Sequence, residues 1–502
     1  MNNQNKGILA SCKPQDVFGY FEDICAIPHG SANEAAVADY IEHFARERGL
    51  FCYRDAVHNV FVKCAASEGH ESAPAVLLQG HTDMVCEKDE GVAHDFETDG
   101  LALLVEDGWI GAAGTTLGGD DGVAVAMMLA ILDNPPEPHP AIECLFTVSE
   151  ETGLVGAWAF DPVAAGMTAR TMINLDSESE GVLTAGCAGG MRTDIKVPVD
   201  TEPLAGTPVR ITITGLSGGH SGVEIHEGHT NAVRLLGRLL RALWLDYEMN
   251  FVAIDGGGKD NAIPRAVTLT LSCADGAENF CRAVRDEAER LRAEPNMIAA
   301  DKDFTCTAEI LTEGVPTVQM DATATRRVFN YLTLGRDGVL EMNAHVKGLV
   351  AYSRNLGIVE TLRDADGTPT HVRFAYSTRS ACEHHLDDAE RELQQLAAIC
   401  SEGMAEVSHH SRYPGWEYAP VSPLRQLWTA VSEELYGITP RVEVIHAGLE
   451  CGILSSKVVV DGMDIISVGP DMRDIHTPRE RLHVASTERT YETVRAVIQK
   501  MV

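Results

Sequence analysis

A histidine and an aspartate follow a short apolar run in the segment VLLQGHTDMV, Val76 to Val85. The apolar residues predict a buried strand, and His81 and Asp83, two positions apart, project to the same side of an extended backbone. An imidazole binds ions such as zinc, and a nearby carboxylate can bind the same ion or orient the imidazole. An isolated pair of this kind is more often a turn, so the interpretation depends on further ligands at other strand ends.

Acidic residues accompany three more apolar segments within the first 180 residues. The segments are the helix 122–132, apolar on nearly all sides, and the strands 144–148 and 171–175; the acidic residues are Asp120, Asp121, Glu150, Glu151 and Asp176. Acids at the start of a helix are usually caps, but adjacent carboxylates repel each other unless a cation lies nearby. The two glycines before the helix lack the Lys-Ser/Thr of a phosphate loop. Cation binding is therefore the better interpretation.

A fifth position of this type lies near the C-terminus, where His476 follows a predicted strand at 465–468. In open α/β sheets the carboxyl ends of strands form sites together, so we expect these side chains to converge. Two histidines and three carboxylates suffice for two zinc-like sites, which leaves Asp83 and one glutamate unassigned. A shared carboxylate would place the ions about 3.5–4 Å apart, and the unassigned glutamate would accept a proton from the hydrolytic water. The sequence thus predicts metal-assisted hydrolysis.

The elements that position these residues alternate between helix and strand. Helical patterns begin near Asp16 and at Ala35, and strands follow near 52–53, 59–63 and 76–78. This alternation is typical of a layered α/β domain. The glycines of the segment 185–190 predict a tight loop.

The character of the chain changes near residue 193. A strand at 209–214 leads into a loop with three histidines and a helix that begins near Asn231, and further strands and helices continue to about residue 410. After this region, residue types that could form a functional site appear again. We therefore predict an inserted α+β domain, 192–412, within a discontinuous domain formed by 1–191 and 413–502, with a last helix near 486–500.

Composition excludes several classes of function. Asp and Glu number 74 against 40 Lys and Arg, a formal charge of −34 that argues against binding of nucleic acid or an anionic membrane. The longest apolar run, Val123 to Leu132, is too short to span a bilayer, and the N-terminus has no signal-peptide core. The 13 cysteines form no CxxC pair, which indicates reduced thiols. A cytoplasmic location is expected.

Taken together, the motifs HTD, LGGDDG, SEETG and INLDSESEG with a late histidine resemble the co-catalytic dizinc aminopeptidase and aminoacylase superfamily. More narrowly, INLDSESEGVLTAGCAGG, GGHSGVEIHEGHTNA, DNAIPR, HAGLECG and SVGPDMRDIHTPRERLHV are similar to the aminoacyl-histidine dipeptidases, the bacterial carnosinase group. The resemblance covers nearly the whole chain. It implies an α/β fold: a mixed-sheet, three-layer catalytic domain with an inserted α+β lid. Because the lid carries dimer contacts in many members, a homodimer through it is a further expectation.

The same resemblance assigns roles at the metal centre. It implies that Asp120 bridges two ions, that Asp83 orients His81, and that Glu150 is the general base. The remaining ligands form two pairs, His81 with Asp176 for one ion and Glu151 with His476 for the other. The cofactors are then two divalent ions, zinc first, with manganese or cobalt as alternatives because both tolerate His and carboxylate ligands.

The resemblance also points to residues of the inserted domain and its surroundings. A lid histidine, His226 or alternatively His220, would stabilise the carbonyl oxyanion. The candidates for binding the substrate's terminal carboxylate are Asn261, Arg265 and Arg379, and those for the specificity pocket are His446, Gly448 and Glu450.

The implied activity is hydrolysis of dipeptides of the Xaa-His type, such as β-alanyl-histidine, so the expected partner is a small peptide. A tripeptidase or an N-acyl-amino-acid hydrolase of the same superfamily is an alternative, because the same ligands serve these reactions. A non-catalytic metal-binding scaffold is a second alternative, but the presence of every ligand and of the general base favours an enzyme.

Overall fold

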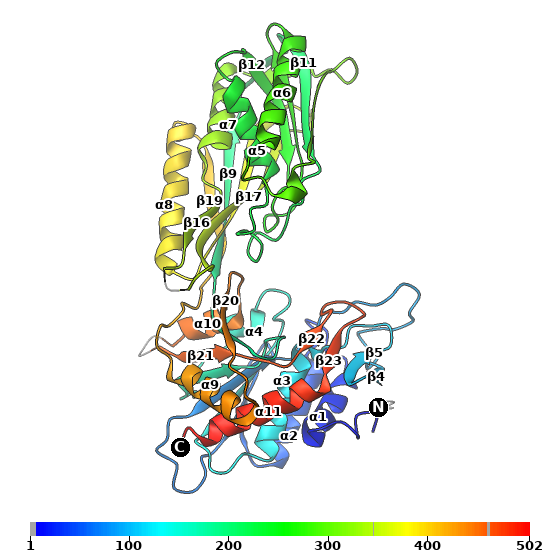
Figure 1. The fold of residues 1–502 in the computed structure, drawn as a ribbon, viewed down its shortest axis with the longest axis vertical. Helices are drawn as coiled ribbons and strands as arrows, with labels where there is room; N and C mark the ends of the chain where they lie inside the picture. The colour runs from blue at the N-terminus through cyan, green and yellow to red at the C-terminus, as the bar shows by residue number, and fades with distance from the viewer. Residues whose placement is uncertain (1–6, 345, 459–461) are drawn as a thin grey trace. The chain divides into compact units, whose positions relative to one another are not determined.

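The computed structural model describes residues 7–344, 346–458 and 462–502. These residues form two compact units (Figure 1). Unit 1 comprises the described residues of 1–187, 416–444 and 449–502, and unit 2 comprises those of 188–415 and 445–448. None of the helices in these described ranges is long and apolar enough to cross a membrane.

Unit 1 is built on an eight-stranded mixed sheet. In spatial order its strands are β1 (Phe51–Arg54), β2 (Val60–Cys64), β6 (Ile142–Thr147), β3 (Val76–His81), β7 (Thr171–Asn174), β21 (Asp464–Ser467), β8 (Val182–Cys187) and β20 (Arg441–Ile445). The central strands β6, β3, β7 and β21 run parallel to one another. Their carboxyl ends therefore lie along one edge of the sheet, as predicted from the polar residues that follow them.

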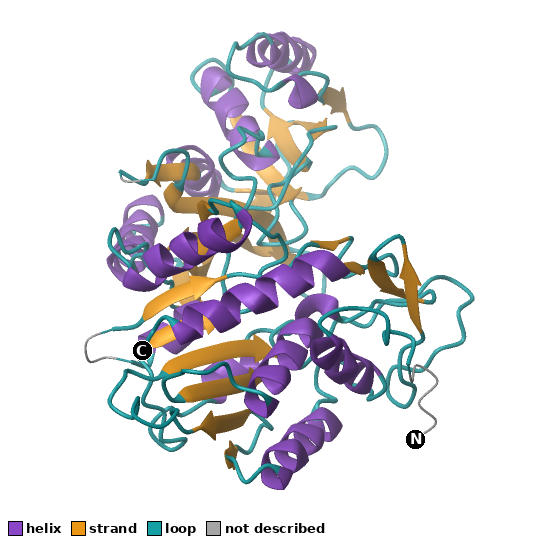
Figure 2. Cartoon of the chain, turned by 60° about the horizontal axis from the view of Figure 1, so that its bottom comes forward, coloured by secondary structure: helices purple, strands orange, loops and turns teal. Residues whose placement is uncertain are grey.

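Helices lie alongside the strands of this sheet (Figure 2). They are α1 (Gln15–Cys25), α2 (Ala35–Glu47), α3 (Gly119–Asp133), α4 (Val155–Ala159), α9 (Pro423–Tyr436), α10 (Glu450–Ser456) and α11 (Val484–Gln499). Strand β3 contacts a helix on each face, because a side chain at Gly80 would meet α3 whereas Gln79 bonds to Glu450 of α10. This arrangement places the sheet between two helical layers.

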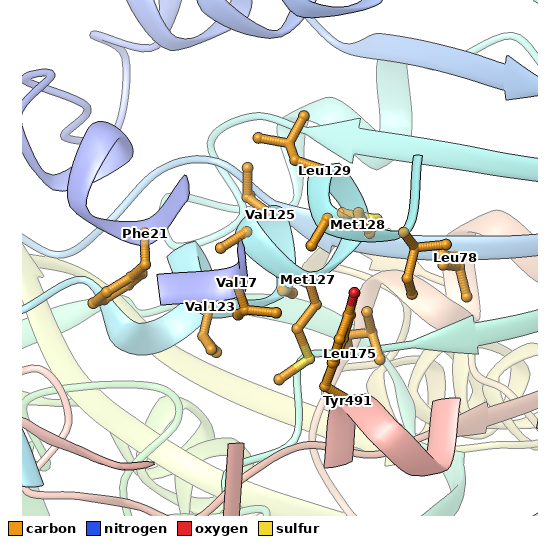
Figure 3. Packing of buried hydrophobic residues seen from close by; sticks show 14 of the residues in the cluster. Val17, Phe21, Leu78, Val123, Val125, Met127, Met128, Leu129, Leu175 and Tyr491 are labelled. Atoms are coloured by element: carbon orange, nitrogen blue, oxygen red, sulfur yellow. The ribbon is translucent and has the colours of Figure 1, made fainter. Parts of the chain in front are cut away.

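Helix α3 forms the centre of the unit 1 core. Every residue from Gly119 to Leu132 is buried, which confirms the prediction drawn from its apolar character. Leu78 of β3 packs in the same cluster as Met128 and Leu129 of α3 (Figure 3). Since each fully buried side chain of this size contributes about 1.5–3 kcal/mol, this packing holds the N-terminus of α3 firmly beside the end of β3.

A second, four-stranded sheet in unit 1 joins the C-terminal part of the chain to its N-terminal part. Its order is β22 (Met472–Arg473), β23 (Arg481–His483), β5 (Trp109–Ala112) and β4 (Leu103–Glu106). The turn between β22 and β23 carries His476. Antiparallel pairing of β23 with β5 therefore attaches this histidine to a segment more than 350 residues earlier in the chain.

Unit 2 contains an antiparallel nine-stranded sheet. Its strands are β14 (Thr305–Ile310), β11 (Thr207–Thr214), β13 (Val267–Cys273), β12 (Met249–Gly256), β17 (Val350–Arg363), β18 (Pro369–Ser380), β9 (Gly189–Pro198) and β19 (Glu406–Tyr413), with β16 (Gly338–Met342) paired to β17. The strands β10 (Thr201–Pro203) and β15 (Val318–Met320) pair separately. The helices α5 (Ala232–Leu243), α6 (Ala277–Arg292), α7 (Ala322–Leu334) and α8 (Glu383–Cys400) share one apolar cluster with the sheet.

One local prediction is wrong. The glycine-rich segment 185–190 is not a tight loop, because β8 continues to Cys187 and β9 begins at Gly189. The glycines have a different cause: a Cβ at Gly189 would lie 2.5 Å from the backbone nitrogen of Gly415, and one at Gly190 would meet the ring of Tyr413. In a strand, glycine marks such a close approach as often as a turn.

Candidate metal centre

Five of the predicted ligands meet at the carboxyl edge of the unit 1 sheet. They come from β3 (His81), the start of α3 (Asp120), the turn after β6 (Glu151), the segment after β7 (Asp176) and the β22–β23 turn (His476). Ligand atoms of His81, Asp120 and Asp176 lie within 4.8 Å of one another, and so do those of Asp120, Glu151 and His476. Asp120 belongs to both groups.

The distances between these atoms suit a pair of cations. His81 Nε2 lies 3.1 Å from Asp120 Oδ1 and 3.5 Å from Asp176 Oδ1. His476 Nε2 lies 3.1 Å from Asp120 Oδ2 and 2.7 Å from Glu151 Oε1. Two atoms that bind one tetrahedral zinc at its usual bond lengths lie about 3.3 Å apart. Asp120 directs one oxygen toward each histidine, which is the arrangement that a bridging carboxylate requires.

Asp83 orients the imidazole of His81 and also connects three segments. His81 Nδ1 lies 3.0 Å from the backbone oxygen of Asp83 and 3.3 Å from its Oδ1, so Nε2 is left to face the other ligands. The Asp83 carboxylate accepts hydrogen bonds from the Ser31 hydroxyl (2.8 Å) and from the backbone nitrogens of Glu150 (2.9 Å) and Glu151 (3.4 Å). It therefore holds the turn that carries both glutamates.

Buried negative charge dominates the electrostatics of this edge. Burial, reinforced by neighbouring carboxylates, raises the pKa of Glu150 to about 9 and that of Asp176 to about 7. Hydrogen bonds to Asp120 and Glu151 raise the pKa of His476 to about 10. Burial alone would lower the pKa of His81, but the carboxylates of Asp176 and Asp120 raise it well above its ordinary value. A site that forces protons onto its own ligands is one that bound cations would stabilise.

The remaining acid of the LGGDDG motif, Asp121, is not one of the residues whose ligand atoms are grouped here. Its carboxylate is fully buried and accepts the backbone N–H of His81 at 3.2 Å. The N-cap of α3 is Gly118, with a left-handed backbone and no side-chain cap. The two aspartates are thus not helix caps: Asp120 points to the candidate ions, and Asp121 fixes the end of β3.

Residues that sequence reasoning missed support the turn after β6. Ser149 has a positive φ of 50°, and its backbone nitrogen and hydroxyl both donate to Glu34 Oε1, at 2.8 and 2.6 Å. Glu34 is buried, and Ser31 lies just before it in the chain. No local sequence pattern reveals that the side chain of Glu34 reaches Ser149 and that of Ser31 reaches Asp83.

A buried polar layer lies behind the ligands. Gln79 Nε2 donates to Glu450 Oε2 at 2.6 Å and to Thr147 Oγ1 at 3.1 Å, and Gln79 Oε1 accepts from Asn174 at 2.6 Å. Thr147 also donates to Glu450 Oε2, at 2.7 Å. Gln79 and Asn174 stand two residues before His81 and Asp176, so the layer ties together the strands that carry these ligands. Glu450, predicted to line a specificity pocket, is fully buried here and belongs to this layer.

Three residues predicted to act on the substrate come together within unit 2: His220, a candidate for the oxyanion, and Arg379 and His446, candidates for substrate binding. A Cβ at Gly222 would lie 2.5 Å from the backbone oxygen of His446, 3.0 Å from His220 Cε1 and 3.2 Å from Arg379 Cζ. Arg379 is buried and donates to the hydroxyl of Tyr413 at 3.1 Å, while its Nε has no hydrogen-bond partner. A buried guanidinium with a free donor is a group that can bind a carboxylate.

The histidines of this group differ in their surroundings. His446 is buried and bonds through Nε2 to Ser353 Oγ at 2.7 Å. Burial, together with the charges of Arg379, His226 and His220, lowers the pKa of His446 to about 3. Nδ1 of His220 accepts two backbone N–H groups, from Gly222 and Val223, so its Nε2 carries the proton. His226 lies exposed on the same loop.

The other predicted residues of unit 2 occupy the surroundings of this group. The backbone oxygen of Asn261 accepts the N–H of Ser221 at 2.9 Å, and a Cβ at Gly448 would touch the ring of Tyr413. Arg265 donates instead to the backbone oxygen of Leu216 (3.3 Å) and lines a separate cavity of about 620 Å³. The structure therefore does not join Arg265 to the group around Gly222.

Known proteins match this chain over most of its length. The model of peptidase family M20/M25/M40 matches residues 77–500. The cytosol non-specific dipeptidase of Escherichia coli is 32% identical over 481 residues, 95% of this chain and 96% of that protein. The structure of the aminoacylhistidine dipeptidase from Vibrio alginolyticus superposes with a TM-score of 0.90 and 31% identity, covering 98% of each chain. The aminopeptidase PepT from Bacillus cereus shares the fold at a TM-score of 0.57 and 16% identity, covering 98% of this chain and 99% of that one.

Proposed function

The chain belongs to peptidase family M20/M25/M40, and from this premise we propose that it hydrolyses dipeptides in a metal-dependent reaction, with Xaa-His dipeptides among its substrates. The two relatives of about 30% identity are a non-specific dipeptidase and an aminoacylhistidine dipeptidase. The observation that carries the proposal is Asp120, which directs one carboxylate oxygen toward each of two histidines. A carboxylate shared by two cations requires this arrangement, and Asp120 belongs to both groups of residues that could hold an ion.

In this proposal the chain holds two divalent ions. His81 and Asp176 would hold one, Glu151 and His476 the other, and Asp120 would be shared. Zinc suits the mixed nitrogen and oxygen ligands, and manganese or cobalt would also be accepted. When bound, the ions would polarise the peptide carbonyl and lower the pKa of the attacking water.

Glu150 is the proposed proton carrier. It neighbours the ligand Glu151, its backbone nitrogen is fixed by Asp83, and its carboxyl group lies within 4.8 Å of ligand atoms of His81 and Glu151. Its carboxylate would accept the proton of the water and donate it to the leaving amine, since both transfers occur at the same bond. Asp83 would keep the His81 ring in one orientation throughout.

The proposed roles in unit 2 start from the buried guanidinium of Arg379. Arg379 would bind the substrate's terminal carboxylate, and His226 or His220 would stabilise the oxyanion. A homodimer formed through unit 2 is also proposed, and light scattering on the purified protein would measure it. A cytoplasmic location, the compartment in the name of the E. coli relative, would be checked by cell fractionation.

The test is a substrate panel measured before and after metal removal. Purified protein is assayed with β-alanyl-histidine, other Xaa-His dipeptides, dipeptides without histidine, tripeptides and N-acetyl amino acids. We expect cleavage of dipeptides, loss of activity after chelation, and recovery when zinc, manganese or cobalt is added back. Cleavage confined to tripeptides or N-acetyl amino acids would reassign the substrate, and activity that survives complete chelation would refute the metal-dependent reaction.

A further inference from the structure

Glu480 is a buried carboxylate that no part of the proposed reaction uses. It lies in the turn between β22 and β23, four residues after His476, and is only 3% exposed. Its side chain accepts the backbone N–H groups of four consecutive residues, 117–120. Oε2 bonds to Leu117 (3.0 Å) and Gly118 (3.3 Å), and Oε1 bonds to Gly119 (2.8 Å) and Asp120 (3.4 Å).

Two of these N–H groups, those of Gly119 and Asp120, open α3, and the other two belong to its N-cap Gly118 and to Leu117 just before it. The first amides of a helix have no partner within the helix and carry a partial positive charge, so a carboxylate is a favourable partner. The aspartates at the start of α3 do not fill this role, since both side chains are directed elsewhere. The cap is supplied by Glu480, from the opposite end of the chain.

The same carboxylate is attached to the segment that carries His476. The backbone nitrogen of Glu480 donates to the oxygen of Thr477 at 3.0 Å, and both His476 and Asp474 adopt a positive φ in this turn. Glu480 is therefore bonded on one side to the backbone of Asp120 and on the other to the turn of His476. Across that connection, His476 Nε2 and Asp120 Oδ2 lie 3.1 Å apart.

We infer that Glu480 is a positioning residue that fixes Asp120 relative to His476 and thereby sets the affinity for the cation that these two residues share with Glu151. The inference rests on the proposed metal centre. It differs from a purely structural role because, beyond the pairing of β23 with β5, the carboxylate bonds to the backbone of the candidate ligand Asp120 from a position four residues after the candidate ligand His476. Removal of a group that orients a metal ligand typically weakens metal binding by about 10- to 100-fold.

The variant Glu480→Gln tests this role. Glutamine keeps the size of the side chain, but it replaces one accepting oxygen by an NH₂ group that cannot accept a hydrogen bond from the backbone. Metal-free protein is titrated with Co²⁺, followed by calorimetry and by visible absorption, which reports the coordination of the ion. We expect the wild type to bind two equivalents and Glu480→Gln to bind one of them at least about tenfold more weakly, with altered absorption bands for that equivalent.

Glu143→Gln is the matched control. Glu143 is also a buried carboxylate of unit 1 that accepts backbone N–H groups, from Thr168 and Ala169 at 3.0 Å, but it lies near the start of β6, away from the ligands. We expect this variant to lose stability and yet bind both Co²⁺ equivalents as the wild type does. Should Glu480→Gln fail to fold, Glu480→Asp keeps the charge, shortens the side chain by one methylene and takes its place.

Three outcomes would overturn the inference. The first is that the Glu480 variant binds both equivalents with wild-type affinity and wild-type spectrum. The second is that the control loses affinity to the same degree, which would show that general destabilisation is the cause. The third is that the wild type binds no Co²⁺, a result that would remove the proposed metal centre together with the inference; the first two would leave that centre intact.

Discussion

Replacement of Glu150 by glutamine should separate catalysis from metal binding. Glutamine has the same shape, and the backbone nitrogen of residue 150 keeps its bond to Asp83. None of the four N···O contacts that connect the histidines with Asp120, Asp176 and Glu151 involves Glu150. We therefore expect Glu150→Gln to retain both ions and to lose the group that accepts the proton.

The expected sizes of two effects can be stated. Loss of a general base lowers kcat by about 10²- to 10⁴-fold, equivalent to about 2.7–5.4 kcal/mol. In the metal-free protein, burial raises the pKa of Glu150 from 4.5 to about 9. Between these pH values the unfolded chain loses the proton and the folded chain keeps it, so folding is disfavoured by about 1.4 kcal/mol per pH unit above 4.5. At pH 7 the metal-free variant should be more stable than the metal-free wild type by about 3 kcal/mol.

The assay needs three measurements on each protein: kcat with a dipeptide substrate, metal content, and the midpoint of urea unfolding at pH 7 in the presence of a chelator. We expect lower kcat, unchanged metal content and a higher midpoint for the variant. At pH 4 the difference in midpoint should vanish, because the carboxyl group is then protonated in both states. Turnover near the wild-type rate would exclude Glu150 as the base, and a lower midpoint at pH 7 would refute the electrostatic reasoning.

Three further predictions concern the residues around the ligands. Ser31→Ala removes the hydroxyl that donates to Asp83, and we expect kcat to fall about tenfold, or about 1.4 kcal/mol, at unchanged metal content; an unchanged kcat would show that this bond is dispensable. Because burial raises the pKa of Glu450 to about 7, Glu450→Gln should alter the thermal midpoint little at pH 7. Glu450→Ala removes the acceptor that Gln79 and Thr147 share and leaves a cavity, and should cost about 2–5 kcal/mol; equal midpoints of the two variants would contradict this. Burial lowers the pKa of His446 to about 3, so between pH 6.5 and 3 only the unfolded chain takes up a proton and stability falls by about 1.4 kcal/mol per unit. His446→Gln has no imidazole and does not lose stability in this way. The free energy of unfolding in urea should therefore favour the wild type over the variant by less at pH 5 than at pH 7. An equal difference at both pH values would contradict this prediction.

Much of the fold was predictable because its signals are local. The apolar run of α3 indicated a buried helix, and the apolar segments before His81, Glu150 and Asp176 indicated strands, as the structure confirms. The segment 185–190 was not predictable in this way. Its glycines permit either a turn or a close approach of another strand, and only the neighbouring chain at Tyr413–Gly415 decides between them.

The candidate ligands could also be proposed from sequence, since residue type and position at a strand end are local properties. Their supports could not. Ser31 lies 52 residues from Asp83, Glu480 lies 363 residues from Leu117, and Glu450 lies 371 residues from Gln79. No periodicity records a hydrogen bond over such distances, so the bonds that Glu450 accepts from Gln79 and Thr147 could not be foreseen.

The sequence by itself thus determined which side chains can bind cations and on which elements they lie, together with the family to which the motifs point. Only the tertiary structure decided which oxygen of Asp120 faces which histidine, and which buried acids form hydrogen bonds to the segments that carry the candidate ligands. The physical reason is that a buried polar group must find a partner wherever the folded chain brings one. That partner is set by packing of the whole unit and not by neighbours along the chain.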